Sequence, residues 1–514
     1  MKYLTLALAF AVAGCSFQLR GDDDAGTGGG SDGGDVVDLS MSGDDLGGGG
    51  AGGGGGGGVG GGGGGGGMTA PDLATPNDLA PPIVCTAGSS SCSGNTLLTC
   101  PDGTVQNMTA CPLGCSMSGG AHCEALYPRA PITRDDFNTT GLTAVTLTAN
   151  SVYIGADNGL IGPANAPIRH ANTVATTYEV HDGVGFHLVA IAGSSVKLGI
   201  YTFSSLTVNA NVTINAYGAN GIALVSAGDL TMNGQFDATC AGNVNLAALI
   251  GTPAPNAQGP GGGAGGKPGT ASGGFGTGGV GGANADNTHA AGGGGGAYAD
   301  TGGVGGADGA NPGGASGPTY GDTMLTTLYG GAGGGAGGQS GSANIAYGGG
   351  GGGLAIMVAQ GTLTFGAGNM SGGINAGGCG GLPNSNVGGG GGGSGGTILV
   401  QALTVHLAAK GVLAANGGSG AAGNAAPGMM SNGKPGPFGA GAAMGGQTGG
   451  GADGGNGGNA TTTSGANGGG SASAGGGGGG SVGRIRIETQ SGAATLDGGN
   501  AISPSATVST VDIH

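Results

Sequence analysis

The sequence predicts an all-β fold: an irregular, parallel β-helix-like solenoid that carries long glycine-rich inserts and follows a small disulfide-rich module. Three observations predict it. Short apolar strands recur from residue 221 onward, runs of six glycines stand directly before three of these strands, and six cysteines fall within 85–123. A β-sandwich with disordered glycine loops is the alternative, because its strands have a similar length.

Composition limits how much of the chain can form a core. Glycine accounts for 140 of the 514 residues, charged residues for 7%, and tryptophan is absent. Glycine has no apolar side chain to bury, so we expect a modest core with long glycine-rich excursions. The net charge of −16 argues against nucleic acid as a partner, because phosphates require a basic surface.

Residues 1–14 predict a lipoprotein signal peptide. Lys2 precedes an apolar run from Leu4 to Ala13, which is too short to span a bilayer. The small residues that end at Cys15 resemble the lipobox of bacterial lipoproteins. The resemblance implies that Cys15 is lipidated and that the mature protein is anchored in the outer membrane, exposed at the cell surface. An ordinary signal peptide with an incidental cysteine is the alternative.

Residues 15–82 predict an acidic tether rich in glycine, aspartate and proline. Residues 47–67 are glycine except Ala51 and Val59, and the whole segment lacks a periodic apolar pattern. Glycine tracts behave as flexible coil, and the aspartates add charge repulsion. We expect the tether to hold the later domains away from the membrane.

The next segment, 83–126, predicts a disulfide framework. An even number of cysteines in a short exported segment is typical of a stapled module, and six cysteines allow 15 pairings. No C-x2-C pair is present, so zinc is not expected. The spacing loosely resembles peritrophin-type chitin-binding modules, but no aromatic side chain precedes Tyr127 to stack on a sugar. The cysteines are Cys85, Cys92, Cys100, Cys111, Cys115 and Cys123.

Within the main domain, 130–514, four aligned copies predict stacked coils of three short strands each. Alternating apolar residues mark half-buried strands, and no copy can bury its apolar face alone. The third strand contributes one bulky apolar residue. The predicted inward residues are Ile222/Leu224, Leu354/Ile356, Ile398/Val400 and Ile485/Ile487 in the first strands, Leu230/Met232, Leu363/Phe365 and Leu403/Val405 in the second, and Phe236, Ile374, Leu413 and Leu496 in the third.

The glycine-rich inserts all leave the repeat just after the third strand, at about 241–353, 377–396 and 416–483. If the coils stack, the inserts emerge on one side. Glycine pairs at three-residue spacing, as in 330–341 and 449–460, suit polyglycine II helices with three residues per turn. Disordered loops are the alternative, since ordering glycine costs the most entropy.

Two further cysteines occupy equivalent positions in consecutive copies. Cys240 follows Phe236 by four residues, and Cys379 follows Ile374 by five. Neighbouring coils lie about 4.8 Å apart, which is within the Cα range of a disulfide. We therefore predict a Cys240–Cys379 disulfide that closes the largest insert.

No catalytic constellation stands out in the sequence. Asp229 and Asp237 are the nearest carboxylates on the clearest coil, but later copies do not repeat them. Residues 302–310 approach a calcium-binding nonapeptide, with Asp308 one position late. We therefore expect no enzymatic activity, no cofactor and no metal.

The segment EVHDGVGFHL contains the densest histidine group. On a strand, Glu179, His181 and His187 share one parity beside Asp182, which is compatible with a metal site. A solvated strand face is the commoner origin of this pattern.

The lipobox, the repeated Asp-Leu-Ala of the tether, the six-cysteine module and the strand repeat together resemble glycine-rich surface lipoproteins of myxobacterial type. These are often labelled PE-PGRS-like, although no PE domain is present here. The resemblance implies a lipid-anchored structural or adhesion protein of a Gram-negative bacterium. Its expected partners are the membrane and an extracellular glycan or other surface proteins. A β-helix carbohydrate-binding or carbohydrate-active protein is the alternative, and it requires a pocket with carboxylates and aromatic residues.

Overall fold

The chain divides into two compact units, Met1–Asp78 and Leu79–His514, and all described residues belong to the second. The predicted signal peptide, Cys15 and the tether up to residue 82 lie outside the described residues. The computed structural model describes residues 85–104, 106–111, 113–163, 166–240, 257–267, 279–282, 284–286, 289–309, 311–339, 345–385, 387–423, 431–448, 452–471 and 474–514.

The described residues confirm an all-β architecture with an N-terminal disulfide-rich module. Their helical content is a single 3-10 turn, η1 (Arg134–Phe137). In the part of the chain that the structure describes, no helix has the length and apolar character needed to cross a membrane.

The cysteine-rich module consists of short antiparallel strands. β1 (Ser89–Ser93), β2 (Thr96–Cys100) and β3 (Asn107–Ala110) form one sheet, and β4 (Cys115–Ser116) pairs with β5 (His122–Cys123). Of the residues in β1 to β3, only Cys100 is buried, so these strands have almost no apolar core. Disulfides compensate by restricting the unfolded chain. They join Cys85 to Cys100, Cys92 to Cys115 and Cys111 to Cys123.

Most of the remaining strands form two large sheets. The twelve-stranded sheet contains β7 (Ala144–Leu147), β10 (Glu179–His181), β11 (Val184–Ala190), β12 (Lys197–Phe203), β13 (Ser205–Val208), β15 (Gly221–Ser226), β16 (Leu230–Met232), β20 (Leu354–Phe365), β22 (Thr397–Leu407), β24 (Arg484–Thr489), β25 (Thr495–Leu496) and β27 (Thr507–Thr510). The seven-stranded sheet contains β8 (Ser151–Gly155), β9 (Ile161–Gly162), β14 (Thr213–Tyr217), β17 (Gln235–Asp237), β21 (Gly372–Asn375), β23 (Gly411–Ala414) and β26 (Ala501–Ser503).

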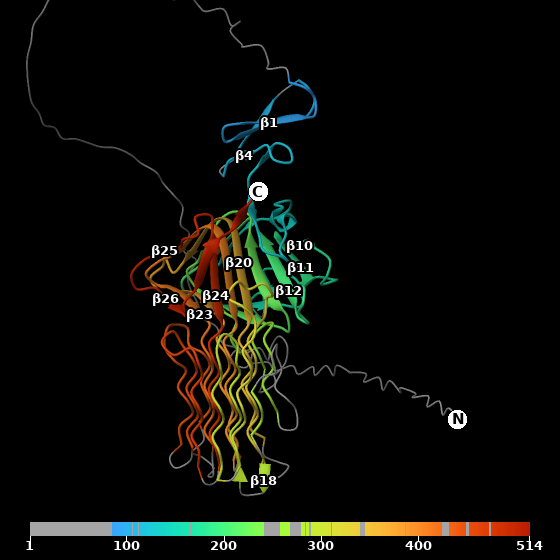
Figure 1. Ribbon diagram of the computed structural model, residues 1–514. Coiled ribbons are helices and arrows are strands. Elements are labelled where there is room, and N and C mark those ends of the chain that lie inside the picture. Colours follow the sequence, from blue (N-terminus) through green and yellow to red (C-terminus); the bar gives the residue numbers. More distant parts are fainter. Residues whose placement is uncertain are drawn as a thin grey trace, which may run out of the picture. The chain divides into compact units, whose positions relative to one another are not determined.

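From β7 onward the chain alternates between the two sheets in successive passes. β9, β10 and β11 pair antiparallel with their neighbours, so the sheets are mixed. The other passes pair in parallel with the pass before them, so equivalent residues lie opposite one another, as Phe236 does with Ile214 and Ile374. Three short strands per pass were expected. In β20 and β22 the first two merge into one long strand with a register shift, and both parts belong to the larger sheet (Figure 1).

The predicted inward residues Leu354 and Ile356 of β20 are wrong by one position, and Leu403 of β22 also packs on the outer face. The predictions for Leu363, Phe365 and Val405 are confirmed, because these residues lie in the core between the sheets. Ala355 and Met357 lie in the core between the sheets, whereas Leu354 and Ile356 pack on the outer face of the larger sheet. All residues in 354–359 are apolar and buried, so this stretch shows no alternation to fix the register.

The fourth copy also differs from the prediction. Leu496 belongs to β25 in the larger sheet, opposite Leu407, and its side chain is 52% exposed. Ile502 takes the third-strand position instead, opposite Leu413. The connection between β24 and β25, residues 490–494, is longer than the connection 227–229 between β15 and β16, which shifted the alignment.

Two apolar clusters hold the strands. The inner cluster lies between the two sheets and contains the equivalent residues of successive passes, such as Phe236, Ile374 and Leu413. The outer cluster lies on the other face of the larger sheet. Three short segments cover that face, contributing residues such as Leu126, Leu325 and Val511. One of these coverings is a strand pair, β6 (Leu126–Tyr127) with β28 (Asp512–Ile513).

The glycine-rich inserts form a bundle of extended segments that run side by side next to the sheets (Figure 1, lower part, yellow to red). Residues 475–483 show its hydrogen bonding. Their N–H groups donate in turn to three neighbours, and each neighbour accepts from every third residue at 2.7–3.0 Å. The donor–acceptor pairs are 475→290, 478→293 and 481→296; 476→469, 479→466 and 482→463; and 477→421, 480→418 and 483→415.

The carbonyl groups of the same segment serve three further neighbours. Gly475, Gly478 and Ser481 accept from segment 389–395, Gly476 and Gly479 from 303–306, and Gly477 and Gly480 from 455–458. One extended segment is therefore bonded to six others. All of these bonds use the backbone alone.

This packing excludes side chains. A Cβ atom on any of Gly475–Gly480 would lie less than 3.0 Å from a backbone atom of another segment. Close approach of backbones, rather than flexibility, therefore requires the run of six glycines.

A fourth disulfide lies where the chain passes from the sheets into the bundle. It joins Cys240 to Cys379, the pair that the repeat alignment singled out, with the Cα atoms 5.4 Å apart. The two cysteines are 139 residues apart in the sequence, so the bond closes the largest insert.

Candidate functional site

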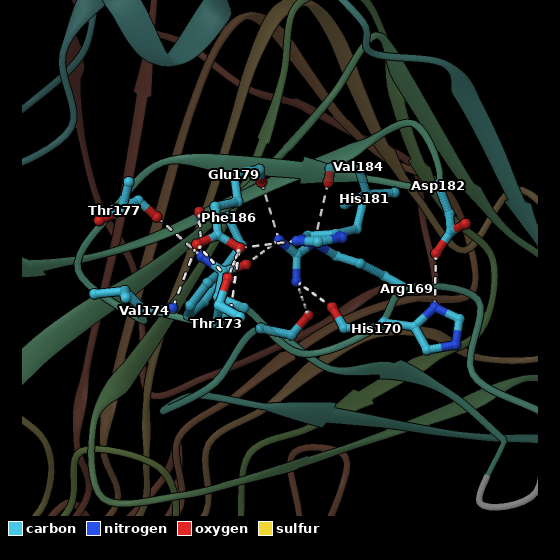
Figure 2. Close-up of polar contacts among 12 residues, drawn as sticks. Arg169, His170, Thr173, Val174, Thr177, Glu179, His181, Asp182, Val184 and Phe186 are labelled. Atoms are coloured by element: carbon cyan, nitrogen blue, oxygen red, sulfur yellow. Dashed lines mark hydrogen bonds and ion pairs between the residues drawn. The ribbon is translucent and has the colours of Figure 1, made fainter.

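The histidine-rich segment surrounds a buried arginine (Figure 2). Arg169 is fully buried and lies beside β10 and β11, with its guanidinium 5.4 Å from the ring centre of Phe186. Burial lowers its pKa from the ordinary value, because a charged group loses solvation there. A buried cation must recover that solvation from hydrogen bonds.

Every N–H of Arg169 has an acceptor. Nε donates to the Val184 carbonyl, one terminal nitrogen donates to the Gly159 and His170 carbonyls, and the other donates to the Glu179 carbonyl and the Asn172 side chain. Because all five donors of a guanidinium are used, none remains for a ligand. The arrangement joins β10 and β11 to the loop that precedes them, which is a structural role.

The histidines of this region form separate pairs with carboxylates. His181 lies 2.8 Å from Glu179, His170 lies 2.9 Å from Asp182, and His187 contacts Asp136 of η1. Among the described residues, no three His, Cys, Asp or Glu side chains are placed to hold a metal ion together. The shared strand parity therefore does not bring these side chains to one site.

The pairing of His181 with Glu179 has a large effect on the pKa of the Glu179 carboxyl group. The hydrogen bond from His181, assisted by bonds from Thr173 and Val174, lowers the pKa of Glu179 from 4.5 to about 2. The carboxylate is thus held in its charged form as part of the same local framework.

The two carboxylates that the sequence placed on the clearest coil also have local roles. Asp229 accepts from the Thr362 amide at 2.7 Å, and Asp237 accepts from the amide and hydroxyl of Thr239. Asp237 belongs to the smaller sheet, whereas Asp229 directly precedes β16 of the larger one. The two do not form the paired carboxylates of a glycosidase.

Asp308 lies in the glycine bundle, fully buried, and neither of its carboxylate oxygens has a hydrogen-bond partner. Within the described ranges, Asp308 belongs to no group of three His, Cys, Asp or Glu residues that could hold a metal ion. The geometry therefore does not assign a cation to it.

A different set of polar side chains lines a groove of about 490 Å³ on the outer face of the larger sheet. Its walls are segment 127–130, Met324 and the C-terminal segment 509–512. Its floor consists of Gln401 on β22 together with Arg486 and Glu488 on β24. The volume falls within the range of small-molecule sites.

Glu488 is the centre of the floor. One carboxylate oxygen accepts from Arg129 at 2.6 Å and from Arg486 at 2.5 Å, and the other accepts from Gln401 at 2.6 Å. Arg486 and Glu488 are 2% and 3% exposed. The planar groups therefore hold one another in fixed positions. In the groove as a whole the formal charges balance, because Asp512 of the wall is a second carboxylate beside the two guanidinium groups.

No sequence motif predicted this floor, although one segment carries a signal for it. In the segment GRIRIET, charged residues occupy the outward positions where β22 has Leu399 and Gln401. A switch from apolar to charged residues on one face of a repeat marks a place where the covering of the sheet changes.

Comparison of the chain with protein-family models, curated proteins and solved structures found no match.

Proposed function

We propose that the chain is a lipid-anchored structural or adhesion protein on the surface of a Gram-negative bacterium, without catalytic activity. In this proposal a parallel β-helix-like solenoid carries a polyglycine II bundle that serves as a stiff projection. The observation that carries the proposal is the hydrogen bonding of segment 475–483 to six neighbouring segments.

The bundle supports this role because its bonding repeats every third residue. Three residues per turn is the period of a polyproline II helix, whose three sides in polyglycine are all open to other backbones. A segment bonded on every side is stiff and presents few reactive side chains. The in-register parallel passes of the two sheets likewise support a solenoid, since each pass adds one layer to the stack.

The anchor is tested by fractionation. Cys15→Ala should move the protein from the outer-membrane fraction to the periplasm or medium, and protease applied to intact cells should digest the wild-type chain. Cys15→Ser serves as a second variant, because it also lacks the thiol. Retention of both variants in the membrane would contradict the lipid anchor.

The bundle is tested by hydrogen exchange on the purified chain. The nine amides of 475–483 should be strongly protected, because each donates within the bundle. The intrinsic exchange rates of the same residues in an unstructured peptide provide the unprotected reference. Exchange at the unprotected rate throughout 475–483 would leave disordered loops as the correct description.

Carbohydrate binding is the second candidate function, and the groove around Glu488 is the observation that favours it. A carbohydrate-active enzyme is less well supported, because Glu488 already accepts from three donors and is not poised as an acid or base.

A further inference from the structure

A row of threonines crosses the outer face of the larger sheet. The strands β7, β13, β16 and β20 pair in parallel and in register there. The residues that lie opposite one another along this row are Thr146, Thr207, Thr231 and Thr364. The next strand, β22, places His406 in the same row, and β25 places Thr495 beyond it.

The row faces away from the core and stays accessible. In β20, Leu363 and Phe365 on either side of Thr364 belong to the inner cluster, so Thr364 points to the other face, because successive side chains of a strand alternate. The outer cluster takes residues from the first part of β20, between Leu354 and Val358, so its covering segments lie there. Thr146 is exposed, and the other three threonines are half-buried between their neighbours.

A shorter second row lies two positions earlier in the same strands. Thr362 of β20 is opposite Thr404 of β22, with the two Oγ1 atoms 3.1 Å apart, and Ser205 of β13 is opposite Ala144 of β7. The exposed Asp229, which directly precedes β16 and accepts from the Thr362 amide, interrupts this row. The face therefore consists mainly of short side chains that present hydroxyl and methyl groups.

The hydroxyls of the first row are not used by the protein. In the described part of the chain, no side-chain hydrogen bond is formed by Thr146, Thr207, Thr231 or Thr364. These four residues also carry no charge. Each of them therefore offers one methyl group and one hydroxyl that can donate to and accept from water.

The spacing of these groups is fixed by the sheet. Neighbouring strands lie about 4.8 Å apart, and equivalent positions two residues apart in one strand are separated by roughly 6.6 Å. The hydroxyl and methyl groups thus repeat in two directions on a rigid support. A partner that meets such an array at every position must itself be periodic.

The chemistry of the row narrows the choice of partner. It has none of the aromatic or arginine anchors of a protein interface, and no positive charge for an anionic polymer. A single soluble sugar requires a concave site, which a row on a sheet face does not form. Ice is an uncharged lattice whose surface oxygens donate and accept hydrogen bonds at fixed repeats, and methyl groups fit between its ordered waters.

We propose that this threonine face binds ice. The hydroxyls of the row join the oxygen lattice of the crystal surface, and the methyl groups occupy the spaces between water molecules. The inference goes beyond the proposed structural or adhesive role and does not rest on it, because the face exists whether or not the chain is lipid-anchored.

The test uses the full chain, purified in detergent, and a slowly growing ice surface. The chain should become enriched in the ice and slow the recrystallisation of small crystals, whereas an inert protein in the same detergent should be excluded. Exclusion of the wild-type chain from the ice would overturn the proposal. Retention on microcrystalline cellulose without uptake into ice would also overturn it, and would assign the face to a crystalline polysaccharide.

Variants on and off the row provide the second part of the test. Thr231→Tyr places a bulky ring in the centre of the row and should abolish uptake into ice. Thr140→Tyr, at an exposed threonine outside the row, should leave it unchanged. Melting temperatures report whether both variants keep the fold, and equal uptake of the two folded variants would contradict the assignment.

A third variant should increase binding, which a merely structural role of the row does not explain. His406, which pairs with Asp497 at 3.1 Å, separates Thr364 from Thr495 in the row. His406→Thr brings a hydroxyl into register at this position and should raise uptake into ice. Unchanged uptake by the folded variant would show that the row is not the binding face. None of these outcomes bears on the fractionation of Cys15→Ala, which tests the anchor alone.

Discussion

The stacked sheets and the glycine bundle solve the same packing problem in opposite ways. In the sheets, side chains such as Phe236, Ile374 and Leu413 meet in a core between two layers, and the backbones bond within each layer. In the bundle, the backbones themselves form the core, and one segment bonds to six neighbours. The two regions should therefore respond differently to substitution, since one needs suitable side chains and the other needs none.

The most direct test of this difference between the sheets and the bundle is to place a side chain in the bundle. Gly478→Val should destabilise the chain by more than about 4 kcal/mol, because its Cβ would meet the Gly303 carbonyl and no backbone can withdraw. Denaturant unfolding with limited proteolysis measures the loss.

Gly441→Ala is the matched control, because a Cβ there meets nothing within 4 Å. Its effect should stay within about 0.5 kcal/mol. A wild-type unfolding curve for Gly478→Val would show that the segments are not held backbone to backbone.

The complementary change removes a side chain from the core of the sheets. Phe365 is fully buried, so Phe365→Ala should cost about 3–5 kcal/mol in unfolding free energy. Leu363→Met, which keeps the volume, should cost less than about 1.5 kcal/mol. No volume-conserving exchange of this kind exists at Gly478. Equal losses of unfolding free energy for Phe365→Ala and Leu363→Met would contradict the difference between the sheets and the bundle.

The disulfide between the two regions should have a somewhat smaller effect. Replacing Cys240 and Cys379 together by alanine should lower stability by roughly 2–5 kcal/mol, since the bond closes a long loop. Thermal melting under oxidising and reducing conditions measures this. The same treatment of Cys111 and Cys123, which are 12 residues apart, should cost less; the reverse order would indicate that loop length does not set the effect.

The smallest expected effect is a pH dependence that arises from Glu179 in the larger sheet. The folded-state pKa of Glu179 lies below its ordinary value of 4.5, at about 2, so its contribution to stability is present above pH 4.5. That contribution is lost as the pH falls through about 2. Glu179→Gln should flatten the stability profile in this window.

Segment 475–483 of the glycine bundle provides an internal reference for the pH measurement, because none of its residues has a side chain that titrates in this range. Protection of the amides in 475–483, corrected for intrinsic exchange rates, should change less than that of β10 and β11 between pH 5 and pH 3. A parallel loss in both regions would point to global unfolding instead.

Several features of the fold could be predicted from local pattern. Alternation identified strands around Ile222 and Ile398, and the even number of cysteines in a short segment indicated the disulfide module. The residues opposite one another in β17 and β21 were also predicted, because Phe236 and Ile374 are single bulky residues in polar or glycine surroundings.

Other features could not be predicted, because the deciding partner is distant in the sequence. Leu354 and Ile356 face outward since remote segments cover that face of the sheet, which no alternation within 354–359 could reveal. Likewise the groove combines Arg129 of its wall with Gln401 and Glu488 of its floor. Only the pairing of β22 with β24 and the covering by segment 127–130 bring these three positions together.

The sequence by itself determined the two-residue period of the strands and the three-residue period of the glycine segments. It also determined the position of one cysteine after the third strand in each of two consecutive copies. These follow from the geometry of a single chain and are visible in one dimension. The tertiary structure alone decided which face of a strand is inward, which six segments surround 475–483, and which polar residues line the groove around Glu488. Those outcomes depend on what packs against each residue, and burial by distant segments leaves no regular trace in the local pattern.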